Sequence, residues 1–79
     1  MPAEFTAKQG QYLAFIFYYR KINRVPPAQI DIQRYFEVSP PTVHQMVLSL
    51  ERNGLISRTP RAARCIEVLV PQDQLPPLD

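Results

Sequence analysis

The segment that most constrains the fold of this 79-residue chain covers residues 39–56 and reads SPPTVHQMVLSLERNGLI. Ser39 is a favourable helix N-cap, and Pro40 suits the first helical position, where its missing N–H would have no intrahelical partner. Apolar residues then recur with helical spacing and form one stripe. The members of this stripe are Val43, Met46, Val47 and Leu50. We therefore expect a helix that begins at residue 40 and packs this stripe against a core.

The opposite face of the same helix carries polar side chains and no acidic group. Its members are Thr42, His44, Gln45 and Ser49. Side chains that form hydrogen bonds and bear no negative charge are compatible with a groove lined by phosphates. Asn53 and Gly54 then accept the left-handed conformation that ends many helices, so a strand can follow from residue 55.

The segment after this helix has a one-sided charge. Four arginines and no acidic residue lie from position 52 to position 64, namely Arg52, Arg58, Arg61 and Arg64. A β-prone run follows at residues 65–70, after the Thr59-Pro60 pair. This pattern indicates a hairpin with an arginine-bearing tip, which would attract polyanions. The alternative is a solvated hairpin whose arginines only maintain solubility.

Two further helices are expected before residue 39. Thr6 and Gln9 have the spacing of a capping box, which predicts a first helix over residues 7–23. Its core stripe should contain Tyr12 or Leu13, together with Ile16 and Tyr19. A second helix should begin near Pro27 and direct Ile30, Ile32 and Phe36 to the core, with Val38 closing the turn. Three helices plus a two-stranded wing predict a mainly α chain with a small β-hairpin, a winged helix-turn-helix.

These motifs together resemble the N-terminal DNA-binding domain of LexA-type repressors. The resemblance rests on FTAKQ at residues 5–9, the Pro26-Pro27 pair, TVHQMVLSLERNGLI at residues 42–56 and IEVL at residues 66–69. The pattern in residues 42–56 is shared by other winged-helix repressors, including iron- and metal-responsive ones. Two features depart from the family: the loop before residue 40 is shorter, and Ala28 stands where a hydroxyl cap is usual.

The resemblance implies a transcriptional regulator, usually a repressor, that binds double-stranded DNA with sequence specificity. The helix that starts at residue 40 would then enter the major groove, where early positions lie deepest. The residues expected to face the bases are Thr42, His44 and Gln45. The residues expected to contact phosphates or to act from the wing are Ser39, Arg52, Arg58, Arg61 and Arg64.

The chain is expected to form one domain over residues 1–70 and a flexible, proline-containing tail over residues 71–79. The tail, PQDQLPPLD, has three prolines and two acids, which leaves too little apolar surface for independent folding. We expect a disordered end or a short extended peptide. LexA-type repressors continue into a self-cleaving serine-lysine domain that also forms the dimer. Because no counterpart follows here, we do not expect an enzyme.

The charge balance, the apolar runs and the few Cys and His residues limit the kinds of molecule that the chain is expected to bind. Residues 1–70 hold nine bases and five acids, a mildly basic balance that alone does not diagnose nucleic-acid binding. No apolar run approaches the roughly 18 residues needed to cross a bilayer. We therefore expect a cytoplasmic protein without membrane contact, associated with the bacterial nucleoid if the resemblance holds. Cys65 and His44 are the only residues of their types, so we expect no metal site. The sequence shows no evident ligand pocket or phosphate-binding loop, so we also expect no cofactor and no small-molecule ligand.

Apolar side chains surround the predicted first helix instead of lining one stripe. They are Tyr12, Phe15, Ile16, Phe17, Tyr18 and Tyr19. Because such helices are normally buried on more than one side, we expect a homodimer contact through Phe15, Tyr18 or their neighbours. In the alternative, the tyrosine rings pack over the domain's own surface. A different interpretation of the whole chain is a winged-helix protein-interaction module that uses this helix without specific DNA binding.

Overall fold

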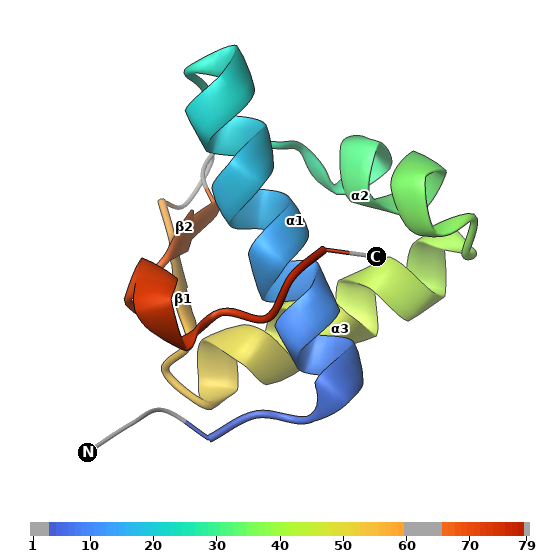
Figure 1. Cartoon of the computed structure of the whole chain (residues 1–79). Coiled ribbons are helices and arrows are strands. Elements are labelled where there is room, and N and C mark those ends of the chain that lie inside the picture. The colour runs from blue at the N-terminus through green and yellow to red at the C-terminus, as the bar shows by residue number, and fades with distance from the viewer. Residues whose placement is uncertain (1–3, 60–65, 79) are drawn as a thin grey trace.

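Three helices precede a two-stranded antiparallel sheet in the computed structural model, which describes residues 4–59 and 66–78. The elements are α1 (Ala7–Asn23), α2 (Gln29–Phe36), α3 (Pro40–Arg52), β1 (Ile56–Arg58), β2 (Ile66–Val68) and the 3₁₀ turn η1 (Gln72–Gln74). Figure 1 shows α1 in the centre, with α2 on one side, the hairpin on the other and α3 passing behind it. This arrangement confirms the predicted mainly α fold with a small β-hairpin.

The first helix covers the residues that the sequence predicts. The Thr6 hydroxyl accepts a hydrogen bond from the Gln9 amide at 3.1 Å, and the Gln9 side-chain oxygen accepts one from the Thr6 amide at 2.9 Å. This capping box satisfies donors that a helix start otherwise leaves unpaired. The helix ends at Asn23, and the next residue, Arg24, is the C-cap, with a left-handed φ of 65°.

The second helix begins later than predicted, at Gln29 instead of near Pro27. Ala28 occupies the N-cap and has no side-chain acceptor, but its amide donates to the Asp31 carboxylate at 2.9 Å. Half of a capping box therefore compensates for the missing hydroxyl. The helix ends at Phe36, and Glu37 is the C-cap, with a left-handed φ of 53° that is uncommon for a residue with a Cβ.

The third helix has the boundaries that its caps predict. It begins at Pro40, and Gly54 follows its end with a φ of 73°. The Leu55 amide donates to the Leu50 carbonyl at 2.9 Å, and the Gly54 amide donates to the Glu51 carbonyl at 3.0 Å. This pair of bonds is a Schellman motif, which turns the chain directly into β1.

The core lies between the three helices and the hairpin. Its largest fully buried side chains are Tyr12, Leu13, Ile16, Ile32, Leu50, Ile56, Val43, Val47 and Pro27. The predicted stripe of α3 is therefore confirmed at three positions, while Met46 is partly buried. Ile30 was predicted to face the core, but 45% of its surface is exposed. The reason is geometric: residues two apart on a helix point to different sides, and Ile32 occupies the inner one.

The hairpin joins β1 and β2 in an antiparallel register that pairs Ile56 with Val68 and Arg58 with Ile66. Ile56 and Ile66 are buried, so one face of the hairpin contributes to the core. The predicted tip, with Arg61, Arg64 and Cys65, lies outside the described residues.

The C-terminal segment packs along α1, and Figure 1 shows it running across the side of α1 that faces away from α3. Leu75 and Leu78 pack against the core, and the Gln11 side-chain amide donates to the Pro77 carbonyl at 2.9 Å. The division between a domain and a tail at residue 70 stays a prediction. The two forms expected for the tail, a disordered end or a short extended peptide, likewise stay predictions, and the described residues of this segment include the 3₁₀ turn η1.

None of the helices within the described residues is long and apolar enough to cross a membrane.

Candidate nucleic-acid interface

The three residues predicted to face DNA bases lie on the solvent side of α3. Thr42, His44 and Gln45 are all exposed, whereas Val43 and Val47 on the inner side have at most 1% of their surface exposed. The buried valines fix the rotation of the helix about its axis, and this rotation presents the polar side chains outward. Their contact with bases stays a prediction.

Ser39 starts α3 in a way that the sequence did not indicate. Its hydroxyl does not cap the helix backbone, and instead lies 2.9 Å from the Thr42 hydroxyl. The prolines at positions 40 and 41 have no backbone N–H, so the first backbone N–H of the helix is that of Thr42. It donates a hydrogen bond to the Ser39 carbonyl at 3.1 Å. Two residues predicted to contact DNA thus form one exposed pair of hydroxyls at the start of the helix.

A groove runs beside this exposed face, between the start of α1 and α3. Its lining residues are Thr6, Gln9, Pro41, Thr42, Gln45, Met46 and Ser49. The Gln9 side-chain nitrogen donates to the Ser49 hydroxyl at 3.2 Å, so the residue that caps α1 also links α1 to α3. The two residues are 40 positions apart in the chain, and no local pattern could have revealed this contact.

Arg58 was predicted to reach DNA, but it is held by an acidic residue of α3. Its Nη2 lies 2.8 Å from the Glu51 Oε1, and its Nε lies 3.2 Å from the same oxygen. The two side chains are only 25% and 39% exposed, so the pair is partly shielded from water. A contact between Arg58 and a phosphate would have to share this guanidinium with Glu51.

The other predicted basic contacts divide into two groups. Arg52 lies exposed in the last turn of α3 and makes no ion pair with the residues that the structure describes. Arg61 and Arg64 lie outside the described residues, so their DNA contacts stay a prediction.

The packing of the aromatic side chains limits the surface that the two predicted dimer residues, Phe15 and Tyr18, can offer to a partner. Phe15 is only 8% exposed, and its ring lies 4.6 Å from that of Tyr35 and 5.7 Å from that of Phe36. Aromatic residues of α2 cover this side of α1, so Phe15 has little surface left to offer a partner, and its dimer contact stays a prediction. Tyr18 is half-buried, and Ile22, one helical turn further, is 77% exposed.

These features define a class of protein. Three helices, a third helix with an exposed polar face, and a following hairpin are the architecture of winged helix-turn-helix DNA-binding domains. Residues 4–63 match the family described as the iron dependent repressor, N-terminal DNA binding domain. The chain belongs to this family.

Two curated relatives are both LexA repressors. That of Thermosipho melanesiensis is 34% identical over 70 residues, which cover 89% of this chain and 35% of the relative. That of Thermosipho africanus is 36% identical over 66 residues, which cover 84% of this chain and 33% of the relative. The chain thus spans about a third of the length of these relatives. The resemblance to LexA-type repressors is confirmed, and the matched family and relatives are named as DNA-binding domains and repressors.

The family description names iron, which requires a suitable set of donor groups. Within residues 4–59 and 66–78, no three His, Cys, Asp or Glu side chains come together in a way that could hold a metal ion. A first-row metal needs such a group of donors. The described residues therefore do not fit an iron site.

Proposed function

We propose that this chain is a transcriptional regulator that binds double-stranded DNA with sequence preference and acts as a repressor by occupying its site. The observation that carries the proposal is the exposed, acid-free group of Thr42, His44 and Gln45 on a helix whose inner side is fixed in the core. A helix presented in this way fits the major groove. The family description and the names of the relatives support DNA as the partner.

The proposed contacts differ in what they contribute. Gln45 can form two hydrogen bonds with adenine, so it would discriminate between sequences, with Thr42 and His44 beside it. Ser39 and Arg52 flank this group and would hold phosphates, which fixes position without reading sequence. Arg58, Arg61 and Arg64 would follow the backbone or enter the minor groove from the wing.

We further propose that two copies of the chain bind together. The contact would involve Tyr18 and the neighbouring Ile22. Ile22 exposes a large apolar side chain to water in the single chain, and a partner would cover it. Two recognition helices would then lie about one DNA turn apart, roughly 34 Å, and would select an inverted repeat.

Selection of bound sequences from a random duplex pool, followed by sequencing, tests both proposals. An enriched inverted repeat would support a dimeric regulator, and an enriched single half-site would support DNA recognition but contradict the dimer. Retention that depends on salt without enrichment would contradict sequence preference.

Two variants test the division of labour. Gln45→Ala should lower the preference for one base by about 1–3 kcal/mol and leave non-specific binding unchanged. Arg52→Ala should weaken binding to all sequences and reduce the slope of log affinity against log salt by about 0.9. If both variants weakened every sequence by the same factor, the assigned roles would be wrong.

A protein-interaction module is the second candidate. It is favoured by two exposed apolar residues near the end of α1, Ile22 at 77% and Val25 at 43%. In this case duplex DNA would not be retained at physiological salt, and Ile22→Lys would abolish partner binding.

A further inference from the structure

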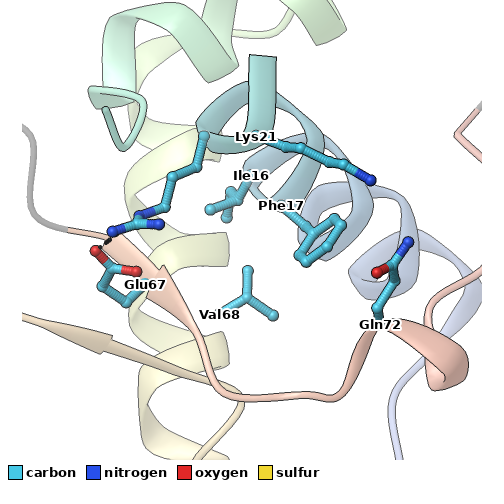
Figure 2. Close-up of a pocket in the computed structure, with 7 residues that line it drawn as sticks. Ile16, Phe17, Lys21, Glu67, Val68 and Gln72 are labelled. Carbon is cyan, nitrogen blue, oxygen red and sulfur yellow. Dashed lines mark hydrogen bonds and ion pairs between the residues drawn. The ribbon is translucent and has the colours of Figure 1, made fainter. Parts of the chain in front are cut away.

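A cleft separates the second half of α1 from β2 and η1, and Figure 2 shows it in close-up. Its volume is about 390 Å³. The lining residues are Ile16, Phe17, Arg20, Lys21, Glu67, Val68 and Gln72. None of them belongs to the proposed DNA contacts or to the proposed dimer contact, so the cleft needs its own explanation.

The floor of the cleft is apolar. Ile16 is 1% exposed, and Phe17 and Val68 are half-buried beside it. Phe17 lies outside the core cluster of the described residues, which leaves part of its ring facing the cleft. An apolar floor with a few polar groups at the rim is the usual form of a site for a small organic ligand, and the volume lies within the usual range.

The polar groups at the two ends of the cleft differ in their state of pairing. At one end, the Glu67 carboxylate is paired with the Arg20 guanidinium at 3.1 Å, and Glu67 is the only acidic residue among the described residues that line the cleft. Figure 2 shows Lys21 and Gln72 on the other side of the Phe17 ring. Lys21 forms no ion pair with any residue in the described part of the chain. One end therefore offers an uncompensated ammonium and an amide donor.

We propose that this cleft binds an organic carboxylate with a compact apolar body. The body lies over Phe17 and Val68, and the carboxylate accepts hydrogen bonds from the Lys21 ammonium and the Gln72 side-chain amide. Charge-assisted bonds of this kind are stronger than neutral ones, which makes the ligand's charge decisive. The cleft is open to solvent, so we expect a weak site with a Kd of about 1 mM for a ligand of this size.

The position of the cleft would connect such a ligand to the wing. Val68 pairs with Ile56 in the hairpin, and the Arg20–Glu67 ion pair already joins α1 to β2. A ligand between α1 and β2 would hold the hairpin against the helix. An effect of the ligand on DNA binding would rest on the proposed function. Binding of the ligand to the cleft does not depend on that function and can be measured directly.

The probe is 3-phenylpropanoate, added to the ¹⁵N-labelled full chain and followed through amide chemical shifts. We expect saturable shifts at Phe17, Val68 and Gln72. Two control ligands separate charge from shape: 3-phenylpropanamide keeps the body without the charge, and acetate keeps the charge without the body. Each should bind at least about tenfold more weakly. Equal binding of the acid and its amide, or no saturable shift at these residues, would overturn the proposal.

Lys21→Met provides the decisive variant, because it keeps the aliphatic stem and removes the ammonium. It should weaken the acid about tenfold and leave the amide unaffected. Lys8→Met is the matched control, since it removes the other lysine of the chain from a site outside the cleft lining. Gln72→Ala should weaken the acid in the same direction as Lys21→Met. If Lys21→Met and Lys8→Met had equal effects, the assigned anion contact would be refuted.

Discussion

The Tyr12 side chain combines a well-packed ring with a buried hydroxyl that lowers the stability of the fold. Its ring is fully buried and stacks on Phe36, with 4.2 Å between the ring centroids and 1° between the planes. Its hydroxyl, however, has no hydrogen-bond partner among the described residues. A buried polar group without a partner costs about 1–3 kcal/mol. The same burial raises the pKa of Tyr12 above its ordinary value of 10.0, because the phenolate loses hydration.

We expect Tyr12→Phe to stabilise the chain by about 1 kcal/mol at neutral pH, because it keeps the stacked ring and removes the unpaired hydroxyl. In the unfolded chain the tyrosine ionises near its ordinary pKa of 10.0, and in the folded chain it ionises at higher pH. The wild-type chain should therefore lose stability as the pH rises above 10.0, and the variant should lose less.

Urea unfolding at neutral and alkaline pH measures both effects. Tyr18→Phe is the control, because Tyr18 lies outside the core cluster of the described residues. A lower midpoint for Tyr12→Phe at neutral pH would show that the hydroxyl is stabilising.

Residue-level features could be predicted where they depend on near neighbours in the chain. Thr6 and Gln9 are three positions apart, and their capping box formed as expected. Phe15 depends instead on Tyr35 and Phe36, which only the packing of α2 brings onto it. The spacing of apolar residues along α1 could not show whether the Phe15 side of the helix contacts a second copy of the chain or is buried by the chain itself.

At the scale of elements, α3 is tied to both of its neighbours by side chains. Gln9 links it to α1 through Ser49, and Glu51 links it to β1 through Arg58. The boundaries of α3 could be predicted, because Pro40 and Gly54 act within one turn. The two links could not, because they depend on the path of the chain after the Schellman turn. The candidate site was thus predictable as an exposed face but not in its ion pairing.

We expect Glu51→Gln to increase affinity for duplex DNA. The substitution removes an acidic group close to the proposed phosphate contacts and leaves the Arg58 charge uncompensated. If Arg58 then neutralises one further phosphate, the slope of log affinity against log salt becomes steeper by about 0.9. The loss of stability should be below about 1 kcal/mol, since the pair is partly exposed to solvent.

Fluorescence anisotropy at several salt concentrations measures this change. Asp73→Asn is the matched control, because it removes the same charge from an exposed position in η1. Unchanged affinity in Glu51→Gln would mean that Arg58 does not lie near the DNA.

At the scale of the whole molecule, the C-terminal segment completes the surface of α1. Gly10 marks the closest approach, since a Cβ there would lie 3.0 Å from the Pro76 Cγ and 2.9 Å from the Phe5 Cε1. Composition alone predicted a flexible tail, because residues 71–79 cannot fold by themselves. Leu75 and Leu78 pack against the core, a contact that composition cannot reveal because it depends on residues far away in the chain, and the flexibility of the tail stays a prediction.

The contribution of this segment to stability can be measured with one leucine. We expect Leu75→Ser to destabilise the chain by about 1–2 kcal/mol, because a partly buried leucine loses its contact with the core. Leu69→Ser is the matched control: Leu69 is 56% exposed, so its substitution should change stability by less than about 0.5 kcal/mol. The segment that carries Leu75 runs across the side of α1 that faces away from α3, so Leu75→Ser should not alter DNA affinity at temperatures where the chain is folded. Thermal unfolding and a DNA titration on the same samples separate the two effects, and equal stability of the two variants would mean that the segment does not hold to α1 in solution.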